Sequence, residues 1–117
     1  MIELFFILAF GHSLADSALQ KQDMIKGKRR NTPIDMSKVP KGQKPINLWW
    51  MWLTHHSLIH GGIVWLLTRN VYLGMVEFIS HWIIDFFKSE NKYNPIVDQS
   101  LHLTMKLFYC IYIYYIV

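Results

Sequence analysis

The sequence predicts an all-α fold, a four-helix transmembrane bundle with both termini on the non-cytoplasmic side. The chain contains four apolar stretches of about 17–23 residues, a length that crosses the hydrocarbon core of a bilayer. The polar residues inside these stretches recur every four positions, which places them on one face of a helix. Eight of the twelve Lys and Arg residues fall in a single segment between apolar stretches.

The first helix is predicted over residues 2–20 and opens with IELFFILAF. A secretory signal peptide is the alternative for this start. It fits poorly because Glu3, and no Lys or Arg, precedes the apolar run. Residues 21–46 are polar, rich in Lys and interrupted by three prolines, so we expect a basic loop there.

The other three helices are predicted over about 47–68, 71–87 and 95–117. The turn after residue 68 is short, so the second and third helices should be antiparallel neighbours. In lipid the backbone must satisfy its own hydrogen bonds, which favours helices. A soluble helical bundle is the alternative, but the C-terminal LFYCIYIYYIV has no polar face to present to water. We therefore expect one integral membrane domain over residues 1–117.

The distribution of positive charge predicts the orientation. Cytoplasmic loops of membrane proteins are enriched in Lys and Arg, so the 21–46 loop should be cytoplasmic. Helix alternation then places the 88–94 turn on the same side and both termini on the other. The net charge of +4 would also suit a nucleic-acid partner. None is expected, because nucleic-acid domains spread basic residues over a folded face with stacking aromatics. The expected partner is the lipid bilayer.

Ionisable residues interrupt all four apolar stretches. Each costs roughly 2.5–3.5 kcal/mol within a membrane span, so this many must neutralise one another or bind an ion. Imidazole and carboxylate suit zinc and similar divalent metals, and helical bundles build such sites from i, i+4 pairs. At a rise of about 1.5 Å per residue, the four helices bring these groups to similar depths. The predicted metal ligands are His12, Asp16, His56, His60, His81, Asp85, Asp98 and His102.

We expect three or four of these ligands to hold a zinc-like ion, and two ions are an alternative. Glu77 is the predicted general base of a catalytic site. Hydrogen-bonded pairs that only join helices are the structural alternative, and helix capping is the alternative for Asp98. His55 points roughly 100° away from His56 and is not expected to bind the metal. Cys110 is the only cysteine, which excludes a multi-cysteine zinc site.

Four motifs, GHSLADSALQ, HSLIHG, EFISHWIIDFFK and DQSLHL, occur in this order. Together they resemble a family of small bacterial and phage membrane proteins known only as a domain of unknown function. The resemblance covers nearly the whole chain except the 21–46 loop and the Tyr-rich C-terminus. It implies a multi-pass protein of the bacterial inner membrane and brings no established activity. A looser likeness links the chain to membrane-bound metal-dependent hydrolases.

Three functions from different classes stay open. The first is a metal-dependent hydrolase that acts on a lipid-linked ester or phosphate near the cytoplasmic headgroups, with metal-activated water. The second is a non-catalytic phage effector that binds a host membrane protein and has a structural metal or a polar core. The third is a proton or ion pathway, because chains of Asp, Glu and His also relay protons. Four short helices would then have to form a homo-oligomer.

Overall fold

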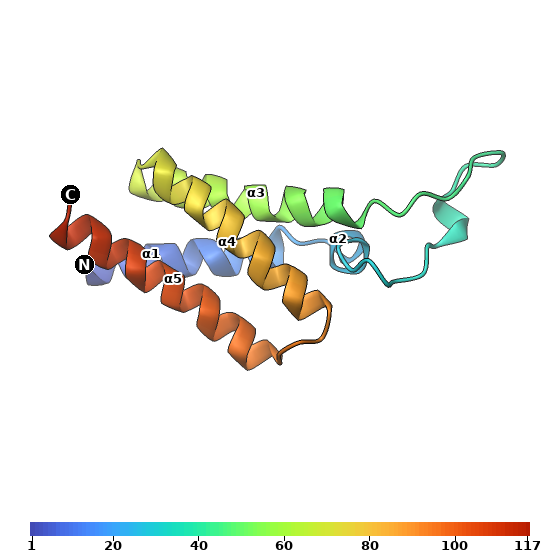
Figure 1. The fold of residues 1–117 in the computed structure, drawn as a ribbon. Helices are drawn as coiled ribbons and strands as arrows, with labels where there is room; N and C mark the ends of the chain where they lie inside the picture. Colours follow the sequence, from blue (N-terminus) through green and yellow to red (C-terminus); the bar gives the residue numbers. More distant parts are fainter.

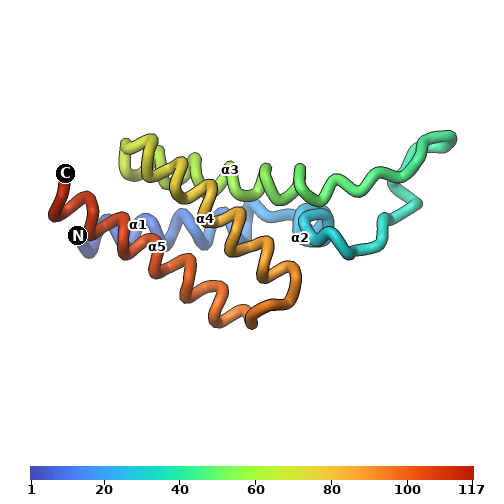
Figure 2. The backbone as a smooth tube through the Cα atoms, in the orientation of Figure 1, coloured from blue at the N-terminus to red at the C-terminus, as the bar shows by residue number.

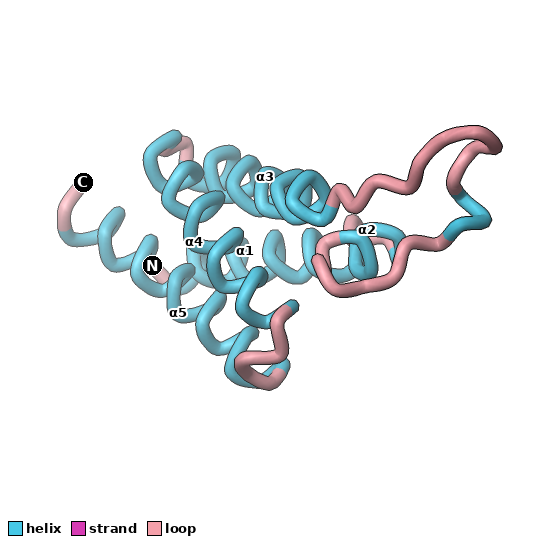
Figure 3. Tube along the Cα trace, turned by 45° about the vertical axis from the view of Figure 1, so that its right-hand side comes forward, coloured by secondary structure: helices cyan, strands magenta, loops and turns pink.

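The computed structural model describes residues 1–117 and contains helices and no strands, which confirms the all-α prediction (Figure 3). Successive long helices run antiparallel to one another (Figure 1). Both termini and the α3–α4 turn lie at one end, whereas the basic segment and the α4–α5 turn lie at the other. The long helices are α1 (Ile2–Ser13), α3 (Trp49–Thr68), α4 (Val71–Ser89) and α5 (Pro95–Tyr115).

Local sequence determines where these helices begin and end. The Asn70 side chain caps α4 by accepting hydrogen bonds from two backbone N–H groups of its first turn. The Asn94 side chain caps α5 by accepting one hydrogen bond, from the Val97 N–H, and Pro95 follows at the first position, where no N–H is needed. Arg69 ends α3 in the left-handed conformation, with φ of 57°. The bounds of α3, α4 and α5 lie within two residues of the predicted ones.

The first predicted helix changes its winding near its end. After Ser13 the chain continues as a π-helical turn, η1 (Leu14–Ala18). There the Leu19 N–H donates to the Leu14 carbonyl, five residues earlier, at 3.0 Å. Such turns insert one extra residue into a helix and often occur at functional sites. The turn contains Asp16, one of the predicted ligands.

The predicted basic loop over residues 21–46 contains two short helical segments, α2 (Gln22–Gly27) and a 3₁₀ turn, η2 (Met36–Lys38). The prolines all follow residue 32, so the first residues of the segment are free to form a helix. A Cβ on Gly27 would lie 2.4 Å from Trp52 Cδ1, so glycine permits α2 to pack against α3. Figure 2 shows the backbone leaving the bundle after α2 and returning to α3.

The interior of the bundle is more polar than its exterior. Eleven buried side chains are polar or charged, and seven are apolar. Large apolar side chains instead cover the outside of all four long helices, including Phe6 at 74% exposed, Leu66 at 73%, Ile79 at 55% and Phe108 at 57%. This pattern is the reverse of that in a water-soluble domain.

The predicted transmembrane arrangement gains no support from the helices taken one at a time. None is at once long enough and apolar enough to traverse a bilayer. α1 has 12 residues before the π-turn, and inward-facing ionisable side chains interrupt the apolar runs of α3, α4 and α5.

α3 and α4 meet at two glycines. A Cβ on Gly61 would lie 2.8 Å from the carbonyl oxygen of Gly74, and a Cβ on Gly74 would lie 2.8 Å from that of Gly61. Real Cβ atoms do not approach a backbone oxygen so closely, so the two helices pack at a distance that only glycine allows. A Cβ on Gly62, the next residue of α3, would have no neighbouring atom within 4 Å.

We expect Gly61→Ala to push α3 away from α4 and to lower the free energy of unfolding by about 1–3 kcal/mol, the usual cost of overpacking. Gly62→Ala is the matched control. Its added methyl group meets no atom, so the substitution should be neutral or should stabilise the helix by up to about 1 kcal/mol. Thermal unfolding in detergent, followed by circular dichroism, measures both variants. Equal effects of the two substitutions would contradict the close contact.

Candidate metal centre

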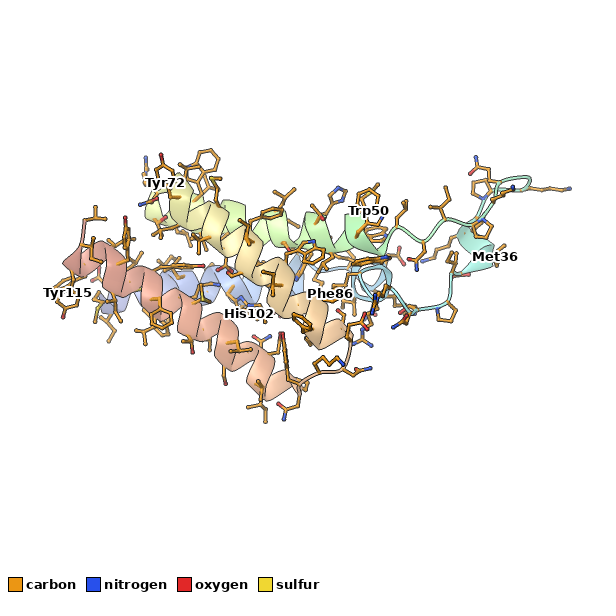
Figure 4. The ribbon with its side chains drawn as sticks, in the orientation of Figure 1. Met36, Trp50, Tyr72, Phe86, His102 and Tyr115 are labelled. Atoms are coloured by element: carbon orange, nitrogen blue, oxygen red, sulfur yellow. The ribbon has the colours of Figure 1, made fainter.

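Five of the six histidines meet inside the bundle. They come from all four long helices, and each is at most 3% exposed. The rings of His60 and His81 stack at 3.6 Å between centroids, and those of His81 and His102 at 4.3 Å. Figure 4 shows His102 pointing from α5 into the bundle, whereas Tyr72 and Tyr115 point away from it. Imidazole binds metals in its neutral form.

The carboxylate of Asp16, presented by the π-turn, lies among these rings. Its Oδ1 accepts a hydrogen bond from His60 Nε2 at 2.9 Å and lies 3.3 Å from His56 Nε2. Its Oδ2 lies 3.3 Å from His12 Nε2 and accepts a hydrogen bond from Gln99 Nε2 at 3.0 Å. One carboxylate therefore joins α1, α3 and α5.

Two overlapping groups of side chains place their ligand atoms within 4.8 Å of one another, close enough to hold a metal ion. A tetrahedral zinc ion with bonds of 2.0–2.1 Å separates its ligand atoms by about 3.3 Å. The same distance separates His56 Nε2 from Asp16 Oδ1. The groups contain five of the eight predicted ligands together with Glu77. They are Asp16–His56–His60–His81 and His12–His60–Glu77–His81.

Every other carboxylate in the bundle interior has a lysine beside it. The pairs, measured from nitrogen to oxygen, are Lys106–Glu77 at 2.5 Å, Lys28–Asp85 at 2.7 Å and Lys88–Asp98 at 3.4 Å. Asp16 forms ion-pair contacts with imidazoles alone. With neutral histidines, four carboxylates and three lysines leave one negative charge unmatched, and that charge belongs to Asp16.

Several buried nitrogens around Asp16 have no hydrogen-bond partner. They include both ring nitrogens of His56 and both of His81. Buried polar atoms almost always have a partner, and leaving one without costs about 1–3 kcal/mol. A cation held by these two histidines and Asp16 would give one nitrogen of each ring a partner and would also offset the negative charge of Asp16. The residues present therefore fit a divalent metal ion.

Three predicted ligands lie beside the two groups and not in them. Asp85 is held by Lys28, and its Oδ2 is 3.7 Å from His56 Nε2. Asp98 and His102, one turn apart on α5, contact each other at 3.2 Å between Oδ1 and Nε2. His102 thus belongs to the histidine cluster without joining either group, and Asp85 and Asp98 each contact one histidine of the cluster.

Tyr93, in the turn between α4 and α5, lies close to these outer carboxylates. Its hydroxyl donates a hydrogen bond to the Ile84 carbonyl. Burial, followed by the negative charges of Asp98 and Asp85, raises the pKa of Tyr93 to about 12. The phenol therefore keeps its proton at neutral pH and acts as a donor.

The sequence did not assign the two buried lysines to the site. Lys106 follows His102 by four residues on α5, so helical spacing alone predicts that both share a face. Lys28 has no such signal, because it is one of eight basic residues in the 21–46 segment. Its ammonium nonetheless enters the bundle and donates to Asp85 and to Gln20 Oε1, at 2.7 and 2.6 Å.

We expect Lys28→Met to lower the free energy of unfolding by about 3–5 kcal/mol, because it leaves Asp85 charged, buried and unpaired. Lys21→Met, at an exposed lysine beside α2, is the matched control and should change it by less than about 0.5 kcal/mol. Denaturant unfolding in detergent compares the variants. The double variant Lys28→Met/Asp85→Asn should recover most of the loss, and a Lys28→Met variant as stable as the control would contradict the buried pair.

Comparison with known families places the chain in one of them. The model of a family described as "Protein of unknown function (DUF3307)" matches residues 4–116, so the chain belongs to this family. No curated protein and no solved structure matches the chain. Membership confirms the expected likeness to a family of unknown function and carries no activity with it.

Proposed function

We propose that this chain is a membrane-embedded metal-binding protein in which Asp16, His56, His60 and His81 hold a divalent, zinc-like ion. The observation that carries the proposal is the unmatched charge of Asp16 among buried histidines whose nitrogens lack partners. Histidine nitrogen and carboxylate oxygen are common zinc ligands. The overlapping group around Glu77 is the weaker site, because Lys106 already brings a positive charge to that carboxylate.

The exposure of Asp16 supports access to the site from outside the bundle. Its side chain is 18% exposed, whereas the side chains of His56, His60 and His81 are at most 1% exposed. When bound with an open coordination position, zinc supplies activated water, the chemistry of metal-dependent hydrolases. Hydrolysis of a lipid-linked ester or phosphate is the catalytic form of this proposal.

The general-base role of Glu77 stays a prediction. Lys106 Nζ donates to its Oε1 at 2.5 Å, and the Tyr109 hydroxyl donates to its Oε2 at 2.8 Å. Each carboxylate oxygen thus already accepts one hydrogen bond from a side chain of α5. In the arrangement described, Glu77 instead orders the interior by joining α4 to α5.

We also propose a lipid bilayer as the environment of the bundle. The helices α3, α4 and α5 contain 20, 19 and 21 residues. At a rise of 1.5 Å per residue each extends about 30 Å, the thickness of the hydrocarbon core. Their ionisable residues face inward, as such residues do in membrane spans, so lipid would meet mainly apolar side chains. The basic end of the bundle would face the cytoplasm of a bacterial cell.

We expect the chain, purified in detergent and dialysed against zinc, to retain stoichiometric zinc by elemental mass spectrometry. His81→Ala and Asp16→Asn should lose most of the metal, because each removes a ligand of the proposed site. His55→Ala is the matched control, since this exposed histidine of α3 lies beside His56, and it should retain zinc. A folded wild-type chain without zinc, or full retention by His81→Ala, would contradict the proposal.

The bilayer proposal has its own test. After expression in bacteria, the chain should stay in the membrane pellet through an alkaline carbonate wash and should be released by detergent. The physical reason is the apolar outer surface of α1, α3, α4 and α5, which water solvates poorly. Recovery of the helical chain in the carbonate supernatant would refute the bilayer environment without deciding the metal site.

A further inference from the structure

A pocket of about 910 Å³ lies between the basic segment and the start of α3, away from the histidine cluster. Its wall comes from α2, from residues 32–39 and from residues 46–52. Part of this wall is apolar and includes Ile25, Ile46 and Trp52, and part is charged. None of its lining residues belongs to the candidate metal groups. A pocket with one apolar part and one charged part suits an amphiphilic ligand, which has a charged group and an apolar portion.

The charged residues of this pocket leave two cations unpaired. Lys38 forms an ion pair with Asp23, and Asp35 accepts hydrogen bonds within its own turn. Lys26 and Arg29, which also line the pocket, form no side-chain hydrogen bond or ion pair. Three cations and two carboxylates line the pocket, so its net charge is +1. The pocket therefore favours an anion.

The pocket lies at the end of the bundle where tryptophans gather. Trp50, labelled in Figure 4, lies at the start of α3 and is 50% exposed. Trp49 packs on Trp82, with 6.2 Å between ring centroids. Tryptophans collect at the headgroup level of membranes. In a bilayer-embedded bundle, the pocket would open at this level.

We propose that this pocket binds the phosphate of an anionic phospholipid through Lys26 and Arg29, with the acyl chains along the apolar surface beside Trp52. The proposal rests on the bilayer environment proposed above. Arg and Lys form charge-assisted hydrogen bonds to phosphate, and clustered basic residues next to membrane helices attract anionic lipids. An amphiphile contacts both parts of the wall, whereas a free phosphate ion contacts only the charged part.

The test titrates the detergent-purified full chain, in a neutral detergent, with short-chain phosphatidylglycerol, and native mass spectrometry counts the bound lipids. Lys26→Gln/Arg29→Gln should weaken binding about tenfold or more, the effect of losing charge-assisted contacts. Lys41→Gln/Lys44→Gln is the matched control. It removes the same charge from exposed positions of the same segment outside the pocket and should leave binding within about twofold of wild type.

Two other outcomes would overturn the proposal. Equal weakening, or none, in the two double variants would mean that no lipid phosphate is held in the pocket. Inorganic phosphate that displaces phosphatidylglycerol at equal concentration would identify the free ion, and not the lipid, as the ligand. Both double variants change exposed residues, so their helix content should match wild type by circular dichroism. Carbonate extraction separately tests the bilayer environment. A failure of the lipid-binding proposal can therefore be distinguished from a failure of the bilayer proposal.

Discussion

The Asp16 carboxylate lies among imidazoles from α1 and α3 and has no lysine or arginine of its own. The three other interior carboxylates each have a lysine, so their charges are matched within the chain. A charge held at low dielectric needs a partner, and unpaired buried charges are strongly destabilising. The proposed cation at Asp16 would supply the positive charge that this carboxylate lacks within the chain.

The same arrangement is the basis for the proposed bilayer environment. The bundle buries carboxylates, lysines and histidines and exposes Phe6, Leu66 and Phe108. In water this arrangement would be unfavourable, because the exposed apolar side chains would gain nothing from the hydrophobic effect. In lipid the preference is reversed, because apolar surfaces are solvated by acyl chains and polar groups gather inside. Helix association then depends on close packing, which the contact between Gly61 and Gly74 provides. The histidine cluster, the apolar exterior and the glycine contact are all consistent with the proposed lipid bilayer.

Sequence patterns predicted the long helices, and five of the eight predicted ligands lie in the two groups that could hold a metal. Turn chemistry at Asn70 and Pro95 marked the helix starts, and four-residue spacing placed His56 and His60 on one face. Rise per residue gives the depth of a side chain, but packing sets the rotation of each helix about its axis. Asp98 and His102 therefore lie outside both candidate metal groups, although helical spacing placed them on one face. The π-turn and the inserted Lys28 depend on tertiary contacts and have no local sequence signal.

X-ray absorption at the zinc edge of the purified, zinc-loaded chain tests the central claim most directly, because it reports the ligands themselves. We expect a shell of nitrogen and oxygen ligands at about 2.0–2.1 Å, with the multiple scattering of three imidazoles. Asp16→Asn should disrupt this shell. A fully folded chain that binds no zinc, or bound zinc without imidazole scattering, would contradict a metal centre built around Asp16.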